Sequence, residues 1–273
     1  MISVLMGVLC SKDRIESMEN AVRSILSQTY QDFELLICDN GSCLEVQVLL
    51  DSLAACDYRI HLLRPVNVNT LQKKLNVCLS AAKGEFIARM DDDDLSHPTR
   101  FEVQLSFLNQ HPEIDFVGCN IMQVDENGSA GVRNLPMYPT VVDFRFVLPY
   151  IHPTLLFRRN ALLSDGGYSE SKWKESCEDY DLLLKLYEQG RRGANIQQVL
   201  LNYSIANSQY RRKPYRHRVN EAVTRYSHFR TLKKLPAWWP YVVKPLVVGL
   251  LPLSALARLK AMRNCILEKS NKT

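Results

Sequence analysis

The sequence predicts an α/β protein in which helices flank a mostly parallel sheet. Strand-like and helix-like patterns alternate through the first half of the 273 residues, which is the arrangement of a parallel sheet with crossover helices. The strand-like runs are almost continuously apolar, as in strands that are buried on both faces. The apolar fraction of 46% and the charged fraction of 23% are typical of a globular protein.

The expected elements are short and follow one another closely. In the first half, the pattern predicts strands at 3–9, 33–38, 60–63 and 86–90, and helices from Ile15, over 44–54 and over 71–82. In the second half, it predicts helices over 98–109 and 179–188, and strands over 115–119, 154–158 and 196–203. A hairpin is expected within 124–132, because the Asp-Glu-Asn-Gly segment is a turn signal.

Four consecutive aspartates, Asp91 to Asp94, directly follow the apolar run 86–90. Asp39 closes an earlier run, so these acids are expected at the carboxyl ends of parallel strands, where such sheets bind ligands. Carboxylates this close repel one another unless a cation is near, and oxygen ligands without His or Cys favour Mg²⁺ or Mn²⁺. The alternative is a solvated acidic turn before the helix near Pro98. The position straight after a buried strand favours the cation site.

The C-terminal part differs in composition from the rest of the chain. Nine Lys and Arg residues fall within 211–234 beside a single acid, Glu221. Such a stretch suits anionic lipid, nucleic acid or a phosphate-bearing substrate, and a basic helix face is the alternative.

Residues 236–257 are mostly apolar but contain four prolines, which argues against a spanning helix. With its Trp and Tyr residues, this segment is expected to lie in the plane of a membrane interface. Packing on the domain, or a dimer contact, is the alternative.

The eight cysteines contain no C-x-x-C pair. This pattern is typical of a reduced cytosolic protein without a thiolate metal site. We also expect no signal peptide, because the first apolar run is short and leads into a helix pattern. The expected location is the cytoplasm, with peripheral attachment to the inner face of the plasma membrane.

Six segments together resemble the GT-A type glycosyltransferases of family 2. They occur in the order and spacing of that family over roughly residues 1–205: SILSQTY (24–30), FELLICDNGS (33–42), AKGEFIARMDDDD (82–94), PTRFEVQ (98–104), HPT (152–154) and CEDYDL (177–182). The resemblance implies a Rossmann-like nucleotide-binding half over 1–120 and an acceptor-binding half over 121–205. Residues 206–273 form the basic and apolar C-terminal segment.

The resemblance also implies roles for the acidic positions. Asp39 would bind the nucleotide base, and an Asx turn before Asn40-Gly41 is compatible with that role. Asp91 and Asp93 would form the family's D-x-D motif, with Asp93 on a Mn²⁺ or Mg²⁺ ion and Asp91 near the ribose or the metal. Asp92 is also assigned to the nucleotide, and Asp94 to a supporting or helix-starting role.

Two further positions, Asn67 and Lys73, are expected to border the nucleotide by resemblance. A solvated helix position is the alternative for Lys73. His152 is expected beside the donor phosphates or as a structural histidine. The chain has Tyr203-Ser204-Ile205-Ala206 where relatives often have Tyr-Arg-x-His, so Arg211 or Arg212 is expected to supply the missing charge.

The Glu-Asp pair at 178–179 is expected to carry the catalytic base. By resemblance Asp179 takes a proton from the acceptor hydroxyl, while Glu178 orients the acceptor or nearby backbone. Acids in the first turn of a helix are also ordinary partners of the helix dipole, which is the alternative reading of this pair.

The sequence therefore predicts an inverting hexosyltransferase. The expected donor is a nucleotide sugar, most simply a UDP-hexose or UDP-N-acetylhexosamine. The expected acceptor is a lipid-linked saccharide of the undecaprenyl diphosphate type, in O-antigen, capsule or other surface polysaccharide biosynthesis. One alternative is a sugar nucleotidyltransferase, but the glycine-rich basic loop that it needs is missing after the first strand. Another is a non-catalytic module that binds an anionic polymer through 211–234. No nucleic acid partner is expected, since aromatic or glycine-rich reading elements are lacking.

Overall fold

The computed structural model describes residues 1–125, 128–164, 166–205 and 214–251. The strands of this part are β1 (Ile2–Val8), β2 (Phe33–Asp39), β3 (Ile60–Leu63), β4 (Phe86–Met90), β5 (Leu95–Ser96), β6 (Phe116–Asp125), β7 (Gly128–Arg133), β8 (Leu156–Arg158) and β9 (Gly193–Ser204). The α-helices are α1 (Ile15–Leu26), α2 (Leu44–Cys56), α3 (Leu71–Ala81), α4 (Arg100–Gln110), α5 (Arg159–Leu163), α6 (Glu178–Glu188), α7 (Tyr215–Thr231) and α8 (Trp239–Leu250). Short 3-10 turns lie at Lys12–Arg14 (η1), Asp143–Arg145 (η2), His152–Thr154 (η3) and Lys172–Lys174 (η4).

The first half is the predicted parallel sheet. The strands run in the order β3-β2-β1-β4, and each neighbouring pair is parallel. Val8 of β1 lies opposite Asp39, and Met6 lies opposite Met90. Asp39 and the aspartates after Met90 therefore meet at one edge of the sheet, as the sequence predicted.

The second half is mixed rather than mostly parallel, so this part of the prediction is wrong. β8 is antiparallel to both β4 and β6, and β5 is antiparallel to β9. β7 is antiparallel to β6, which confirms the hairpin expected within 124–132. The reason is the length of the connections. β7 begins at Gly128, three positions after the last residue of β6, and so short a connection permits only an antiparallel pair. β9, reached through helix α6, lies parallel to β6. β5 has two residues and is too short to show a periodic pattern.

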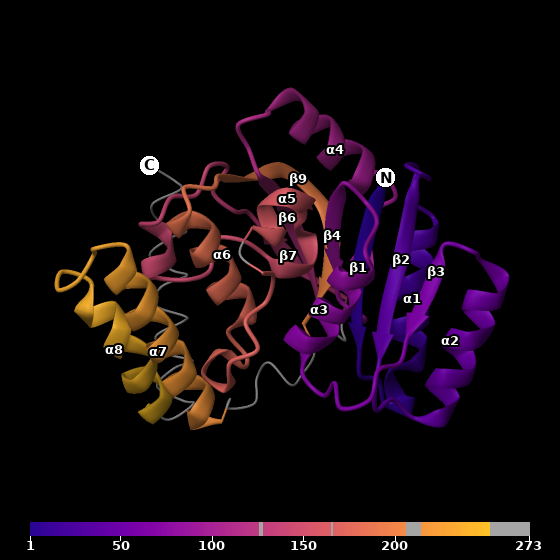
Figure 1. Cartoon of the computed structure of the whole chain (residues 1–273), viewed down its shortest axis with the longest axis horizontal. Helices are drawn as coiled ribbons and strands as arrows, with labels where there is room; N and C mark the ends of the chain where they lie inside the picture. The colour runs from indigo at the N-terminus through magenta and orange to yellow at the C-terminus, as the bar shows by residue number, and fades with distance from the viewer. Residues whose placement is uncertain (126–127, 165, 206–213, 252–273) are drawn as a thin grey trace.

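Helices cover both faces of the sheet (Figure 1). Alternation along β1 sends Ile2, Val4 and Met6 into a core with α1, α2 and α4. Leu5 points to the other face, where residues of α3, α6 and α7 close a second core. The near-continuous apolar strands are explained by this burial on two sides.

Three motif residues fix the loops around the carboxyl edge by buried hydrogen bonds. Gln28 donates to the His97 carbonyl at 2.8 Å and accepts from the Phe101 amide at 3.1 Å. Arg100 donates to the Pro153 carbonyl at 2.8 Å, and Gln104 donates to the Thr154 carbonyl at 2.7 Å. The segment that carries His152 is thereby held from α4.

The C-terminal helices α7 and α8 lie side by side at the end of the molecule opposite α2 (Figure 1). Phe229 of α7 packs edge-on against Trp238, with ring centroids 5.0 Å apart. Both side chains, with Val242 of α8, belong to the core that contains α6. Packing on the domain, which the sequence left as the alternative, thus holds for this part of 236–257; the rest lies outside the described residues. Within the described part of the chain, no helix has the length and apolar character needed to span a bilayer.

Replacing Phe229 with Ala tests whether α7 folds together with the rest of the molecule. Phe229 is fully buried, so we expect Phe229→Ala to lower the free energy of unfolding by about 3–5 kcal/mol. Val223→Ala on the exposed side of the same helix should change it by less than about 0.5 kcal/mol. Urea unfolding followed by circular dichroism measures both. Equal effects of the two substitutions would show that α7 is not part of the cooperative core.

Candidate active site

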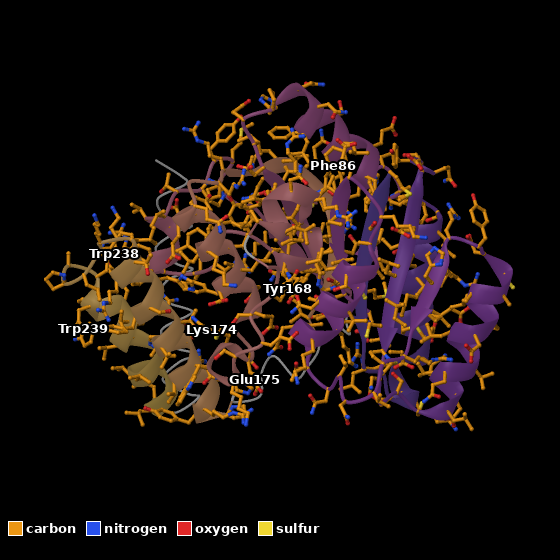
Figure 2. All side chains as sticks on the ribbon, viewed as in Figure 1. Phe86, Tyr168, Lys174, Glu175, Trp238 and Trp239 are labelled. Carbon is orange, nitrogen blue, oxygen red and sulfur yellow. The ribbon has the colours of Figure 1, made fainter. Side chains whose placement is uncertain are left out.

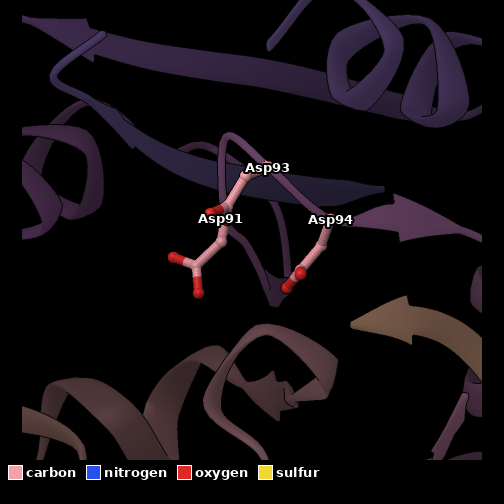
Figure 3. Close-up of side chains that lie close together, drawn as sticks. All are labelled: Asp91, Asp93 and Asp94. Atoms are coloured by element: carbon pink, nitrogen blue, oxygen red, sulfur yellow. The ribbon is translucent and has the colours of Figure 1, made fainter. Parts of the chain in front are cut away.

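Three of the four consecutive aspartates form one carboxylate cluster. Single oxygen atoms of Asp91, Asp93 and Asp94 all lie within 4.8 Å of one another. Figure 3 shows that the three side chains come from one tight turn after β4. Asp92 points elsewhere and pairs with Arg14 at 2.7 Å. The cluster is therefore a consequence of a sharp turn that brings the carboxylate of Asp91 to those of Asp93 and Asp94.

Two arginines partly balance this negative charge. Arg89 of β4 is 1% exposed, and its guanidinium contacts the Asp91 carboxylate and the Met90 carbonyl. Arg14 reaches the turn from η1, 2.7 Å from Asp92 and 3.5 Å from Asp93. Neither of these contacts reaches Asp94.

The cluster still carries unbalanced negative charge. Burial, followed by the charges of Asp91 and Asp92, raises the pKa of Asp93 to about 6. Burial and Asp91 raise the pKa of Asp94 well above its usual range. One oxygen of Asp94 accepts from the Ser204 amide at 2.8 Å, while Oδ2 is buried without a hydrogen-bond partner among the described residues. An all-oxygen cluster with an unpartnered buried carboxylate oxygen fits a hard divalent cation.

One cavity brings the predicted catalytic residues together with Asp91. It has a volume of about 280 Å³ and is lined by residues from several elements, including Asp91, Arg133, His152, Glu178, Asp179 and Tyr203. These positions span more than one hundred residues of sequence. Asp91, His152, Glu178 and Asp179 come from the motif segments of the sequence, whereas Arg133 and Tyr203 do not.

Glu178 and Asp179 open α6 at the cavity wall. Asp179 accepts a hydrogen bond from the Tyr180 amide at 2.7 Å. Burial, and then the neighbouring Asp179, raises the pKa of Glu178 to about 7. Its Oε2 has no hydrogen-bond partner within the described residues. When two adjacent carboxyl groups have different environments, one can hold a proton while the other, as a carboxylate, accepts one.

His152 lines the same cavity but is held as a neutral, structural histidine. Its Nε2 lies 2.8 Å from the Tyr168 hydroxyl, and burial together with nearby Arg89 lowers its pKa well below the usual range. Both residues are buried. Between the two expectations for His152, this geometry favours the structural one.

Asp39 lies at the same edge of the sheet, at the end of β2. It is 3% exposed; Oδ2 is 4.0 Å from the Arg64 guanidinium, and Oδ1 is without a partner in the part of the chain that is described. An unsatisfied buried acceptor is suited to an N–H group of a ligand.

The remaining predicted residues lie elsewhere. Asn67 and Lys73 line a separate hollow of about 440 Å³ with Glu170, so the described residues do not bring them into the cavity of Asp91, and their nucleotide role stays a prediction. Arg211 and Arg212 lie outside the described residues.

Sequence reasoning missed a buried lysine beside Asp39. Lys74, not Lys73, is 2% exposed and donates to the carbonyls of Val8 at 2.5 Å and Asn40 at 2.9 Å. It ties the ends of β1 and β2 together. The signal was available, because Lys74 lies three residues after Leu71 on the apolar side of α3.

Arg14, Arg89, Arg133 and Tyr203 were also missed. An arginine inside an apolar strand is unusual unless it is paired, so Arg89 could have been singled out. Arg133 and Tyr203 come from the ends of β7 and β9, and their sequence surroundings carry no comparable signal.

Curated relatives of this chain are glycosyltransferases. The chain is 34% identical over 260 residues to the "Putative glycosyltransferase EpsE" of Bacillus subtilis, covering 94% of this chain and 92% of the relative. It is 35% identical over 214 residues to the "O-antigen biosynthesis glycosyltransferase WbnJ" of Escherichia coli, covering 76% and 80%. A third relative, at 26% identity over 84% of this chain and 83% of its own, is the Escherichia coli "UDP-Gal:alpha-D-GlcNAc-diphosphoundecaprenol beta-1,3-galactosyltransferase".

Solved structures with a similar fold match this chain at low sequence identity. Residues 1–349 of Staphylococcus aureus TarS in complex with UDP superimpose with a TM-score of 0.64 at 18% identity, over 85% of this chain and 70% of that one. The mannosyltransferase PcManGT from Pyrobaculum calidifontis, in complex with GDP-Man and Mn²⁺, gives 0.60 at 15% identity, over 96% and 79%. The model of the family "Glycosyl transferase family 2" matches residues 8–166. The motifs, the fold and these comparisons agree, and the chain belongs to glycosyl transferase family 2.

Proposed function

We propose that this glycosyltransferase moves a hexose or N-acetylhexosamine, with inversion, from a UDP-sugar to a lipid-linked saccharide during surface polysaccharide assembly. The observation that carries the proposal is the cavity that joins Asp91 to the Glu178–Asp179 pair. It offers a place where a donor diphosphate near the aspartate cluster and an acceptor hydroxyl near a carboxylate base can meet.

The donor half of the site uses the carboxyl edge of the sheet. Asp39 accepts from an N–H group of the base, and Asp91 and Asp92 border the sugar-phosphate part. Asp93 and Asp91, supported by Asp94, would hold Mn²⁺ or Mg²⁺, and such an ion would supply positive charge to the diphosphate. Arg133 at the cavity wall adds a guanidinium for phosphate oxygens. Arg211 and Arg212 stay proposed for the same task.

The acceptor half uses the first turn of α6. Asp179 removes the proton from the acceptor hydroxyl as that oxygen bonds to the anomeric carbon, and the nucleoside diphosphate departs from the opposite side. In-line displacement inverts the anomeric configuration. Glu178, whose pKa is about 7, is partly protonated at neutral pH and can donate a hydrogen bond that orients the acceptor.

The names of similar proteins support the substrate classes. TarS was solved with UDP and with UDP-GlcNAc, which favours a uridine nucleotide, while the GDP-Man complex of PcManGT makes a guanosine donor the alternative. The galactosyltransferase relative is named for a diphosphoundecaprenol acceptor. Membership of this family favours sugar transfer over the two alternatives, a sugar nucleotidyltransferase and a polymer-binding module. No observation at the site among the described residues supports either alternative.

The α7–α8 end of the molecule is proposed to rest on the inner face of the plasma membrane. Trp239 is 49% exposed and Leu250 is 69% exposed. Figure 2 shows Trp239 at this end of the molecule. Lys233 and Lys234, in the turn between the two helices, are also exposed. Exposed aromatic and basic side chains together are suited to an anionic interface.

Asp93→Asn tests the metal and donor assignments. With Mn²⁺ and saturating UDP, we expect the wild-type melting temperature to rise by about 5 °C or more. The Asn variant should lose most of this rise, because it removes a charged oxygen ligand. Differential scanning fluorimetry with UDP, GDP, CDP, ADP and TDP, with and without Mn²⁺, measures the effect. Glu113→Gln, at an exposed distant carboxylate, is the control. A metal-dependent rise that is unchanged in Asp93→Asn would contradict the ligand assignment.

Asp179→Asn tests the base. We expect the UDP-dependent rise in melting temperature to remain, while turnover falls by about 10²–10⁴-fold, the usual contribution of a general base. Release of UDP from a UDP-sugar panel with a lipid diphosphate saccharide acceptor measures turnover. Glu178→Gln is the matched variant on the preceding residue and should have a smaller effect. A larger loss of turnover in Glu178→Gln than in Asp179→Asn would make Glu178 the base.

Trp239→Ala tests membrane attachment. Burying a large apolar side chain is worth roughly 1.5–3 kcal/mol, so flotation with phosphatidylglycerol vesicles should show about a tenfold or greater loss of binding. Tyr58→Ala, at an aromatic side chain 88% exposed near α2, is the control. Binding that both substitutions leave unchanged would place the attachment elsewhere.

A further inference from the structure

A buried ionic network joins the catalytic helix α6 to the C-terminal helix α7. We call it the α6–α7 network; it consists of Lys174, Asp181, Lys185, Glu188 and His228. Asp181 is 1% exposed and lies 2.7 Å from Lys174 Nζ, 2.9 Å from His228 Nε2 and 3.7 Å from Lys185 Nζ. No step of the proposed reaction uses these residues. Asp181 and His228, at the centre of the network, are buried, whereas the side chains of Lys174, Lys185 and Glu188 are partly exposed.

His228 spans two turns of α6. Its Nε2 faces Asp181, and its Nδ1 lies 2.8 Å from Glu188 Oε1. Seven residues separate these carboxylates, so they lie on one side of the helix. Only the doubly protonated imidazolium can donate to both. This bridge opposes both rotation of α6 and sliding of α6 along its axis.

Asp181 and Asp179 serve different sides of the same helix. Residues two apart on a helix do not face each other; Asp179 lines the cavity, whereas Asp181 faces α7. A rotation of α6 that moved Asp181 away from His228 would therefore also move Asp179 relative to the cavity. The two carboxylates share one backbone turn.

The segment that leads into α6 is held by the same elements. Lys174, at the end of η4, also donates to Ser227 Oγ of α7 at 3.1 Å; Figure 2 labels Lys174 and the neighbouring Glu175 in this region. Asn220 of α7, 1% exposed, donates to the carbonyls of Lys172 at 3.2 Å and Glu175 at 3.1 Å. The segment that leads to Glu178 and helix α6, which Glu178 begins, are thus both held by residues of α7.

We propose that the α6–α7 network is a positioning device for Asp179, so that α7 is part of the catalytic machinery although it makes no contact with the substrates. The inference rests on the proposed function, because it takes Asp179 to be the base. His228 and Asp181 are positioning residues in this proposal.

The charge state of His228 gives the device a pH dependence of known sign. Burial opposes its charge, but the hydrogen bonds to Asp181 and Glu188 outweigh burial and raise the pKa of His228. The bridge is therefore complete below the raised pKa and is lost as the pH rises through it. Lys174 from η4 and Lys185 from α6 also face Asp181, with their Nζ atoms 2.7 Å and 3.7 Å from its carboxylate oxygens.

The test compares His228→Gln and His228→Arg with the wild type. Gln cannot donate to both carboxylates at once, so we expect kcat to fall by about 10–100-fold, with UDP affinity in the presence of Mn²⁺ within about twofold of wild type. Arg keeps a permanent charge with several donors and should restore most of kcat. His111→Gln, at a surface histidine paired with Glu113, is the control.

The pH profile of kcat separates positioning from general destabilisation. The wild type should lose turnover on the alkaline side as His228 deprotonates, and His228→Arg should not. If His228→Gln does not fold, the comparison of His228→Arg with wild type still decides. An unchanged kcat in folded His228→Gln, or identical alkaline limbs in wild type and His228→Arg, would overturn the proposal. A wild type that neither binds a nucleotide nor transfers sugar would instead overturn the proposed function.

Discussion

The buried guanidinium of Arg89 is the interaction on which the site depends. β4 ends in four carboxylates at the edge of a sheet whose strands are buried on both faces, and such charge is unstable there without a partner. The Arg89 guanidinium contacts the Asp91 carboxylate and the Met90 carbonyl, just beyond it in the chain, while Arg14 approaches from η1. Removing one partner of a buried pair typically costs about 3–5 kcal/mol. These two arginines allow the aspartate turn to form while leaving Asp94 Oδ2 unsatisfied among the described residues.

Several residues in the motifs that resemble the family are structural clamps rather than chemical groups. Gln28, Arg100 and Gln104 donate to backbone carbonyls of the loops around the carboxyl edge. Backbone carbonyls in loops cannot use strand or helix hydrogen bonds, so buried side chains must satisfy them. The same loops carry His152 and the residues after β4. A motif can therefore recur because it fixes the backbone that presents the reacting groups.

The sequence was sufficient to predict the elements whose conformation depends on their own residues. β3 and β4 have the predicted bounds, and Asp39 and Asp91 lie at one sheet edge as expected, because apolar period and turn residues are local signals. The pairing of β5 and β8 depends on contacts between distant segments, whereas the β6–β7 hairpin follows from a local turn signal. The choice between Lys73 and Lys74 was open to local reasoning, since only Lys74 lies three residues after Leu71 on the apolar side of α3. Arg133 and Tyr203 reach the cavity through strand register alone, which no local pattern encodes.

Two adjacent tryptophans, Trp238 and Trp239, show how the C-terminal helices can both pack on the core and present an exposed face. Trp238 is 8% exposed and packs on Phe229, whereas Trp239 is 49% exposed. The apolar composition of this segment thus divides between a core contact and a free face. Phe229 follows His228 directly in α7, so the residue that anchors the helix pair is next to the residue that bridges Asp181 and Glu188. If lipid contacts the free face, any shift of α8 acts on α7 through Trp238, and from there on the helix that carries Asp179. Membrane contact and the placement of Asp179, the proposed base, would then be coupled by packing.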